Sequence, residues 1–232
     1  MLDLAKIRAI TLDLDDTLWP IWPVIERAEG ALASWLRIHA PRTARVFLDT
    51  SQRFRLREHV VKTRPDIGHD MSALRLEVIR QALQNSAEDT ALAAPAFEVF
   101  FEARMKVDLF DDAVPALEFL AKRFPLVALS NGNADVNRVG IGHFFHGSVS
   151  AHQFGIGKPD PRIFHAAAQS AQCASDEVLH IGDDLALDVQ GALAAGMQAV
   201  WLNRNDQPLP LGARPQLTVS SLAQVVEVLR RE

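Results

Sequence analysis

The sequence predicts an α/β protein whose core is a Rossmann-like, doubly wound parallel sheet, with an all-helical domain inserted into that core. Short apolar runs of strand length alternate with helical patterns from residue 111 onward. Near-continuous apolar runs are typical of parallel strands that are buried on both faces. One further apolar run lies near the N-terminus, and residues 20–110 then carry helical patterns with no clear strand.

The expected strands are short and apolar, and most of them end in a polar residue. They are IRAITLDL (7–14), PLVALS (125–130), VLHIGD (178–183) and QAVWLN (198–203), with GSVSA (147–151) as a weaker candidate. Asp13 lies next to the end of the first run, Ser130 ends the second and Asp183 ends the third, and each of these side chains can do chemistry. Ligands bind at the carboxyl ends of the strands in open α/β sheets, so this edge is the expected site.

Helical patterns fill the intervals between the later strands. They cover 111–124, 160–171, 185–197 and 221–232. The second has Asp160 as its expected N-cap and Pro161 at its first position, and the third stops near Gly196, an expected C′ residue. Strand and helix therefore alternate as in βα units.

The inserted segment differs from the rest of the chain in its periodicity and in its charge. Its helical patterns cover 24–40, 43–64, 71–84 and 96–107. Residues 20–110 hold 13 Lys and Arg against 12 Asp and Glu, whereas the remainder holds 11 against 17. We therefore expect an acidic α/β core formed by 1–19 and 110–232, interrupted by a helical domain at 20–109.

The composition and charge of the chain exclude several classes of function. The chain has 232 residues, a net charge of −5, 48% hydrophobic and 23% charged residues, all ordinary for a soluble globular protein. It has no long block of like charge, so neither nucleic acid nor a membrane is an expected partner, and no obligate protein partner is indicated. The single Cys173 excludes an internal disulfide framework, and MLDLAKIRAI does not resemble a secretory signal. We expect a cytoplasmic protein.

Acidic side chains gather at the expected strand ends. Asp13 and Asp15 follow the first strand, and Asp183 and Asp184 follow the strand at 178–183. Crowded carboxylates repel one another, which raises a pKa or requires a cation. Mg²⁺ prefers hard oxygen ligands and commonly binds one or two carboxylates together with a phosphate. Asp13 and Asp183 can supply that pair.

The same edge carries the groups that phosphoryl transfer needs. A free carboxylate oxygen of Asp13 can attack phosphorus and form an aspartyl-phosphate. Asp15 can protonate the leaving alcohol and later activate water. The phosphoryl oxygens need donors, and the Ser130 hydroxyl, the backbone N–H groups around Asn131 and the Lys158 ammonium are the candidates.

Four motifs in order along the chain, DLDDTLW, SNGN, GKPDPRIF and GDDLALD, resemble those of the haloacid dehalogenase (HAD) superfamily. The inserted helical domain resembles the cap of its first subfamily. The resemblance implies that Asp13 is the nucleophile and a metal ligand, and that Asp183 completes the Mg²⁺ site. It also implies that Asp15 is the general acid/base and binds Mg²⁺ through its backbone carbonyl.

The resemblance also suggests roles for residues around the phosphate. It implies that Ser130 and Lys158 hold the phosphate, with Asn131 beside them. It implies that Asp188 orients Lys158 or the waters of the metal, and Asp184 stands where many relatives carry serine. A capped member of the superfamily usually accepts a small phosphorylated metabolite.

Several of these residues have an alternative structural role, and two other functions are considered. Asp16 is expected to be a turn residue, and His180 a core histidine with satisfied hydrogen bonds. Trp19 and Trp22 either line the pocket or simply pack. A dehalogenase would use an Asp nucleophile without a metal or a second Asp, so Asp15 and the acidic cluster argue against it. A non-catalytic metal-binding module would not also require Ser130 and Lys158.

The substrate class follows from a narrower resemblance. The stretch RPDIGHDMSALR (64–75), together with the motifs, resembles bacterial phosphatases of riboflavin metabolism that act on FMN and on a ribitylaminouracil phosphate. Nucleotides and sugar phosphates are the alternative substrates. His69, Asp70 and Arg75 in this stretch are the candidates to touch the leaving group, unless they only cap and solubilise a helix.

Overall fold

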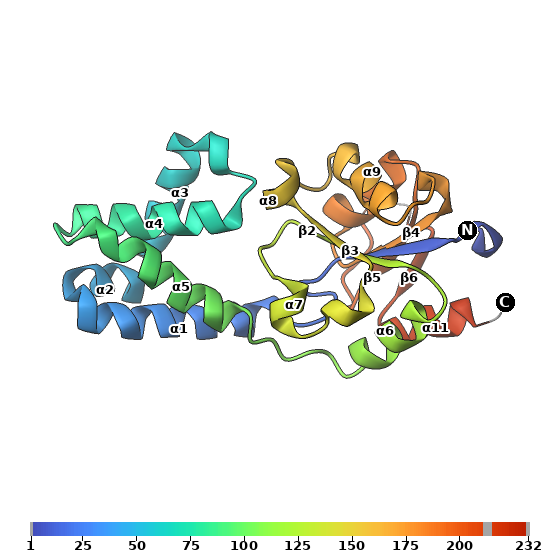
Figure 1. Cartoon of the computed structure of the whole chain (residues 1–232), viewed down its shortest axis with the longest axis horizontal. Coiled ribbons are helices and arrows are strands. Elements are labelled where there is room, and N and C mark those ends of the chain that lie inside the picture. The colour runs from blue at the N-terminus through green and yellow to red at the C-terminus, as the bar shows by residue number, and fades with distance from the viewer. Residues whose placement is uncertain (1, 211–214, 231–232) are drawn as a thin grey trace. The chain divides into compact units, whose positions relative to one another are not determined.

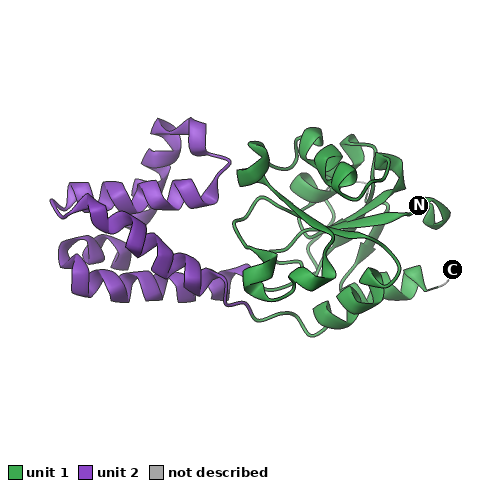
Figure 2. Ribbon diagram, in the orientation of Figure 1, with its two compact units in different colours: residues 1–20, 108–232 green, residues 21–107 purple. Residues whose placement is uncertain are grey.

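The structure is a computed structural model that describes residues 2–210 and 215–230 (Figure 1). The chain divides into two compact units (Figure 2). Met1–Pro20 and Asp108–Glu232 form the first, here named the core unit, and Ile21–Val107 form the second, the cap unit. The junctions lie one residue after and two residues before the positions expected from the sequence.

The core unit is built on a six-stranded parallel sheet with the order β3-β2-β1-β4-β5-β6. The strands are β1 (Ala9–Leu12), β2 (Leu126–Ser130), β3 (Gly147–Ser150), β4 (Val178–Gly182), β5 (Gln198–Leu202) and β6 (Leu217–Val219). β1 is central, with Ile10 paired to Leu126 of β2 and to Leu179 of β4. This topology confirms the predicted fold class. β6 was not expected, because three residues with mixed burial give little periodic signal.

Helices cover both faces of the sheet. They are α6 (Ala113–Ala121), α7 (Val136–Val139), α8 (Ala151–Phe154), α9 (Pro161–Ser170), α10 (Gly191–Ala194) and α11 (Leu222–Leu229), with short turns η1 (Leu4–Lys6), η4 (Gly142–Phe144) and η5 (Ser175–Glu177). Figure 1 shows α9 on one face of the sheet and α6 with α11 on the other. Buried side chains of α9, such as Phe164, pack with Val127 and Leu129 of β2 in one hydrophobic cluster.

The helix expected at 185–197 is divided into two parts. A π-helical segment, η6 (Leu185–Gln190), precedes α10, because the N–H of Val189 bonds to the carbonyl of Asp184 at 3.2 Å, five residues back. Gly196 follows with φ of 80°, the left-handed conformation expected of a C′ residue. The last expected helix, 221–232, is α11, and residues 231–232 lie outside the described residues.

The cap unit is entirely helical in its described elements. These are α1 (Ile21–His39), α2 (Pro41–Leu48), α3 (Thr50–Thr63), η2 (Pro65–Ile67), α4 (Met71–Asn85), η3 (Thr90–Leu92) and α5 (Ala93–Arg104). The expected helix at 43–64 is two helices, because the Asp49 side chain accepts the N–H groups of Ser51 and Gln52 and starts α3. The unit has its own hydrophobic cluster, which includes Leu32, Ile79 and Phe100.

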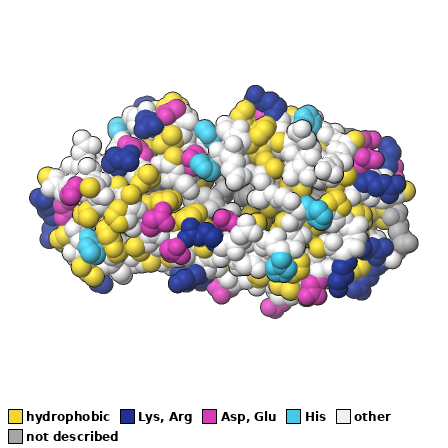
Figure 3. Space-filling model, in the orientation of Figure 1, with side chains coloured by type: hydrophobic (Ala, Val, Ile, Leu, Met, Phe, Trp, Pro, Cys, Tyr) yellow, Lys and Arg dark blue, Asp and Glu magenta, His cyan; other side chains and the backbone are white. Residues whose placement is uncertain are grey.

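The surface carries charges of both signs. On the face drawn in Figure 3, basic and acidic side chains are interspersed among apolar ones. Across residues 2–210 and 215–230, none of the helices is both long enough and apolar enough to cross a membrane.

Candidate active site

Three neighbouring strands of the core unit end at the same edge of the sheet. Asp13 directly follows β1, and its N–H donates to the carbonyl of Ile181 in β4 at 3.0 Å. Ser130 ends β2, and Asp183 directly follows β4. Because β1 lies between β2 and β4, this order brings a nucleophile candidate between a hydroxyl and a second carboxylate.

Lys158 joins this edge from the loop before α9. Its Nζ donates to Oδ1 of Asp13 and to Oδ1 of Asp188, each at 2.5 Å. The side chains of Lys158, Asp13 and Asp188 are 3%, 9% and 2% exposed, so the ammonium is shared by two carboxylates out of water. Charge-assisted hydrogen bonds of this kind are the strong ones in proteins.

Asn131 fixes the backbone of Lys158. Its Oδ1 accepts the Lys158 N–H at 2.7 Å, and its Nδ2 donates to the Lys158 carbonyl at 2.9 Å. A Cβ at Gly157 would lie 2.7 Å from the same Oδ1, so glycine is needed for this close approach. The side chain of Asn131 therefore positions Lys158, which leaves its backbone N–H as the group for the predicted phosphate role.

Asp188 is held by several donors at once. Its Oδ1 accepts from Lys158 and lies 3.0 Å from Nε2 of His180, and its Oδ2 accepts the N–H of Asp184 at 3.0 Å. A Cβ at Gly182 would lie 2.3 Å from Cγ of Asp188, so a larger residue there would displace this carboxylate. The π-helical segment thus carries a buried carboxylate against the end of β4, and π-segments occur often at functional sites.

His180 connects Asp188 to the centre of the sheet. It is fully buried in β4, and its Nδ1 lies 2.8 Å from Oγ1 of Thr11 in β1. Burial lowers the pKa of His180, against the opposing effect of Asp188. An ionised Asp188 only accepts, so Nε2 of the neutral ring donates to it and Nδ1 accepts the Thr11 hydroxyl proton. Both ring nitrogens are satisfied, as expected of a core histidine.

Burial and like charge act together on the carboxylates. Burial raises the pKa of Asp13 well above its usual value, and Lys158 opposes this while Asp188 and Asp183 add to it. Burial, with the charges of Asp188 and Asp16, raises the pKa of Asp183 to about 7. Burial would also raise the pKa of Asp188, but Lys158 and His180 outweigh it and hold that pKa well below its usual value. Burial would lower the pKa of Lys158, but Asp13 and Asp188 raise it.

The acidic cluster fits a hard divalent cation. One carboxylate oxygen from each of Asp13, Asp183 and Asp188 lies within 4.8 Å of the others. Asp188 is committed to Lys158, His180 and the Asp184 N–H, so Asp13 and Asp183 are the pair suited to Mg²⁺. Burial first, and then neighbouring negative charge, raise the pKa values of Asp13 and Asp183, and a bound cation would favour the ionised form of both.

The remaining motif residues lie around this cluster. Ser130 is buried and its Oγ accepts the N–H of Gly132 at 2.9 Å, and such a hydroxyl can still donate its proton to a phosphoryl oxygen. The exposed Asp184 caps η6, since its Oδ1 accepts the N–H groups of Ala186 and Leu187. Asp16 adopts φ of 57° in the turn after Asp15, in keeping with the expected turn role.

Asp15 has a partner that the sequence did not suggest. The indole Nε1 of Trp19 donates to its Oδ1 at 2.8 Å, and the Trp19 ring is fully buried in the core unit. Trp19 therefore packs and contacts the predicted acid/base at the same time, whereas Trp22 is 73% exposed at the start of α1. Spacing alone cannot identify such a bond, because the bond depends on how the turn between the two residues closes.

Two of the three cap candidates have structural contacts within the cap unit. Asp70 is the N-cap of α4 and accepts the N–H groups of Ser72 and Ala73. Arg75 binds Glu29 of α1 at 2.7 Å, and its guanidinium lies 4.2 Å from the ring centre of Phe100 in α5. His69 is half-buried in the turn that precedes α4. The predicted substrate role of these residues stays a prediction.

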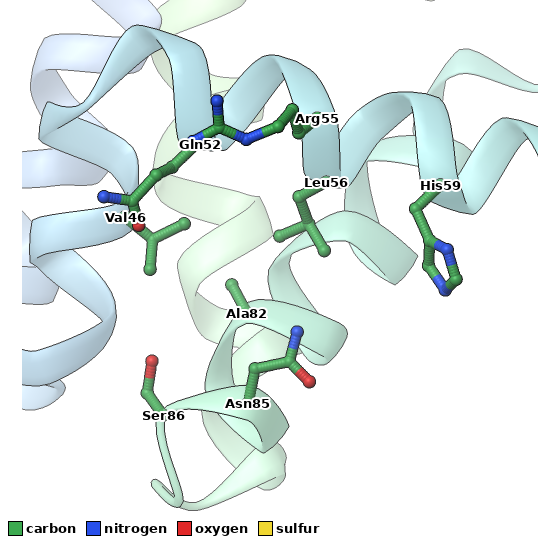
Figure 4. Close-up of a pocket in the computed structure, with 8 residues that line it drawn as sticks. All are labelled: Val46, Gln52, Arg55, Leu56, His59, Ala82, Asn85 and Ser86. Carbon is green, nitrogen blue, oxygen red and sulfur yellow. The ribbon is translucent and has the colours of Figure 1, made fainter.

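The cap unit also contains a groove of about 660 Å³ among α2, α3 and α4 (Figure 4). It is lined by Val46, Gln52, Arg55, Leu56, His59, Ala82, Asn85 and Ser86. None of these residues belongs to the four motifs, and several of them are exposed. The groove is therefore distinct from the acidic site at the edge of the sheet.

The fold and this site define a hydrolase class. The model of the haloacid dehalogenase-like hydrolase family matches residues 7–196, and the chain belongs to that family. It is thus an enzyme, a HAD-like hydrolase, and the phosphatases among its relatives support the phosphatase class predicted from the sequence.

Individual relatives cover nearly the whole chain. The 5-amino-6-(5-phospho-D-ribitylamino)uracil phosphatase YigB of Escherichia coli is 35% identical, over 97% of this chain and 98% of its own. A crystal structure described as a 2-haloacid dehalogenase from Pseudomonas syringae is 38% identical, with a TM-score of 0.91 over 97% of this chain and 99% of that one. A HAD phosphatase from Thermococcus onnurineus shares the fold at 20% identity, with a TM-score of 0.70 over 96% and 98% of the two chains.

Proposed function

We propose that this protein is a Mg²⁺-dependent phosphomonoester hydrolase that acts through an aspartyl-phosphate on Asp13. The observation that carries this proposal is the cluster in which Asp13 shares a buried lysine with Asp188 beside Asp183. Such a set can hold a phosphoryl group by its charge while offering a carboxylate to attack it.

The residues of the chain divide the chemistry between them. An oxygen of Asp13 attacks phosphorus, and Lys158 and the Ser130 hydroxyl donate to the phosphoryl oxygens. Asp15 gives its proton to the leaving alcohol and then takes a proton from the water that hydrolyses the aspartyl-phosphate. Asn131 and Asp188 hold Lys158 in place from its backbone and its ammonium, respectively.

Asp13 and Asp183 would hold Mg²⁺, with the backbone carbonyl of Asp15 as a further ligand implied by the family. When bound, the ion supplies positive charge that neutralises the phosphate and the carboxylates. This removes the repulsion between two acids whose pKa values are raised by burial and by their negative neighbours.

The proposed substrate is FMN or the ribitylaminouracil phosphate of riboflavin biosynthesis. The support is the relation to YigB, which extends over 97% of this chain and therefore includes the cap unit. A relative named phosphoserine phosphatase, from Thermus thermophilus, is 34% identical over only 65% of the chain. Nucleotides and sugar phosphates stay the alternative substrates.

A second candidate function is dehalogenation of 2-haloacids, because the Pseudomonas syringae structure bears that description at 38% identity. Both reactions use a carboxylate nucleophile. A halide is a weak base and leaves without a proton, so a general acid at Asp15 would have no role in that reaction. The acidic cluster of Asp13, Asp183 and Asp188 would also repel a carboxylate substrate, whereas it suits a metal-bound phosphate.

One set of assays distinguishes the candidates. The purified protein is incubated with p-nitrophenyl phosphate, FMN, a panel of phosphorylated metabolites and 2-chloropropionate, each with Mg²⁺ and with EDTA. We expect phosphate release that requires Mg²⁺ and no chloride release. Chloride release that is insensitive to EDTA, without phosphate release, would replace the proposal with the dehalogenase.

A further inference from the structure

The turn after β1 folds back so that Trp19 reaches Asp15. The N–H of Leu18 donates to the carbonyl of Leu14 at 2.8 Å, and the N–H of Asp16 donates to the carbonyl of Trp19 at 2.7 Å. These bonds close the backbone between the two residues. The fully buried indole then donates its Nε1–H to Oδ1 of Asp15 at 2.8 Å.

We infer that Trp19 is a positioning residue for Asp15, and that its indole N–H restricts the rotation of the carboxyl group that transfers the proton. This inference rests on the proposed function, in which Asp15 is the acid and base. Trp19 lies in the first motif, but none of the roles predicted for the four motifs belongs to it.

The indole N–H of Trp19 can only donate a hydrogen bond and cannot accept one. In a protonated carboxyl group the carbonyl oxygen is the better acceptor, and the hydroxyl oxygen carries the proton. The bond from Trp19 therefore holds Asp15 through Oδ1 as an acceptor.

Both half-reactions then use the same positioned carboxyl group. In the first, the proton of Asp15 passes to the leaving alkoxide as the ester P–O bond breaks and the bond from Asp13 to phosphorus forms. In the second, Asp15 takes a proton from water as the water oxygen bonds to phosphorus and the bond to Asp13 breaks. Phosphate is released, Asp13 is free again, and Asp15 has regained its proton.

Rotational control matters because the carboxyl torsion of aspartate is intrinsically broad. A group that is free to rotate presents its proton in the productive direction for only part of the time, and orientation is a large factor in enzymatic rates. Burial of the indole and closure of the turn make its N–H a fixed donor. A buried indole also needs a partner for this N–H, and here that partner is the acid itself.

The test compares two substrates that differ in their need for an acid. p-Nitrophenyl phosphate releases a stable phenolate, whereas glycerol 2-phosphate releases an alkoxide that must be protonated. We measure kcat/KM for both in the wild type, Trp19→Phe, Asp15→Ala and Trp35→Phe. Trp35 lies in α1 of the cap unit, where it stacks on His39 at 4.1 Å, and it is the matched tryptophan control.

Trp19→Phe is expected to lower kcat/KM for glycerol 2-phosphate about 10-fold more than for p-nitrophenyl phosphate. This loss is a part of the ~10²–10⁴-fold rate increase that a general acid supplies. Trp35→Phe should leave the ratio at the wild-type value. Because Trp19→Phe removes volume from a packed core, a second variant carries 3-benzothienylalanine at position 19. This analogue keeps the shape of tryptophan and has sulfur in place of the N–H.

The outcomes separate the inference from the proposed function. An unchanged ratio in both position-19 variants, while Asp15→Ala shifts it, would overturn the role of Trp19 and leave the acid role of Asp15 intact. Equal losses for both substrates would likewise reduce Trp19 to a packing residue. If the wild type hydrolysed neither phosphate, or if Asp15→Ala left the ratio unchanged, the acid role of Asp15 would fail and the inference with it.

Discussion

The core unit and the cap unit both bury charged side chains, but they use them differently. In the core unit three carboxylates, those of Asp13, Asp183 and Asp188, lie around one ammonium from Lys158. In the cap unit the single carboxylate of Glu29 lies between Arg75 at 2.7 Å and Arg53 at 3.4 Å. The residues in the core unit carry more negative than positive charge. The residues in the cap unit do not.

The difference follows from where the backbone brings these residues. Glu29, Arg53 and Arg75 belong to α1, α3 and α4, so their ion pairs tie three helices together. The carboxylates of the core unit come from strand ends and the adjoining π-helical segment. Buried charge by itself therefore does not identify a functional site. Unbalanced like charge at the ends of parallel strands is a better indicator, because it raises carboxylate pKa values and is relieved by a proton or a bound cation.

The largest effect should come from Asp13→Asn. An amide cannot form an aspartyl-phosphate, so kcat for p-nitrophenyl phosphate should fall by at least about 10³-fold. The amide oxygen of asparagine can still accept from Lys158, so the fold should be kept. A variant that kept more than about a tenth of the activity, with deamidation excluded by mass spectrometry, would contradict the nucleophile assignment.

Metal removal should have the next largest effect. EDTA should abolish phosphate release and Mg²⁺ should restore it, and Asp183→Asn should raise the Mg²⁺ concentration for half-maximal activity by about 10-fold or more. Glu88→Gln in the cap unit is the matched control, because Glu88 bonds the Thr43 hydroxyl and N–H far from any motif residue in sequence. Equal Mg²⁺ dependence of the two variants would remove Asp183 from the metal site.

A smaller effect is expected from the buried chain behind Asp188. Thr11→Val keeps the shape of the side chain but removes the hydroxyl that donates to His180, so the histidine is less firmly held against Asp188. We expect kcat to fall by up to about 10-fold, as for other residues that orient the groups of a metal site. Thr11→Ser should restore activity, since it keeps the hydroxyl. Equal activity in the valine and serine variants would show that the chain only stabilises the sheet.

Arg75→Met should affect stability more than catalysis. It removes the ion pair with Glu29 and leaves Arg53, 3.4 Å away, as the remaining cation, so the free energy of unfolding should fall by about 1–3 kcal/mol, the usual effect of weakening the pairing of a buried charge. kcat/KM for p-nitrophenyl phosphate should stay within about twofold of the wild type, since the motif residues are untouched. A selective loss of FMN turnover, with normal stability, would instead support the predicted substrate role of Arg75.

The smallest effect on the general phosphatase reaction should come from His69→Ala. If His69 touches the leaving group, kcat/KM for FMN should fall several-fold while that for p-nitrophenyl phosphate is unchanged, because remote binding energy acts only on the complete substrate. The comparison with Arg75→Met separates substrate contact from helix packing. An unchanged ratio for His69→Ala would leave the flavin assignment to rest on the relation to YigB.

The sequence by itself determined the class of fold and predicted the chemical types of the site residues. Apolar runs of strand length that end in Asp13, Ser130 and Asp183 predicted one sheet edge, since parallel strands must bring their carboxyl ends together. The division into an α/β core and a helical insert was equally visible, because the two periodicities differ. The sequence did not predict β6 or the π-helical segment, whose short lengths give no periodic signal.

Only the tertiary structure decided which side chains contact one another. Thr11 and His180 are 169 residues apart, and their bond depends on the pairing of β1 with β4. The bond from Trp19 to Asp15 depends on a turn that closes through its own backbone hydrogen bonds. The ion pair between Glu29 and Arg75 depends on how α1 and α4 are brought together, since both pack against α5. A pattern of residue types fixes which faces are buried, whereas hydrogen bonds depend on distances of a few tenths of an ångström that only the packed chain sets.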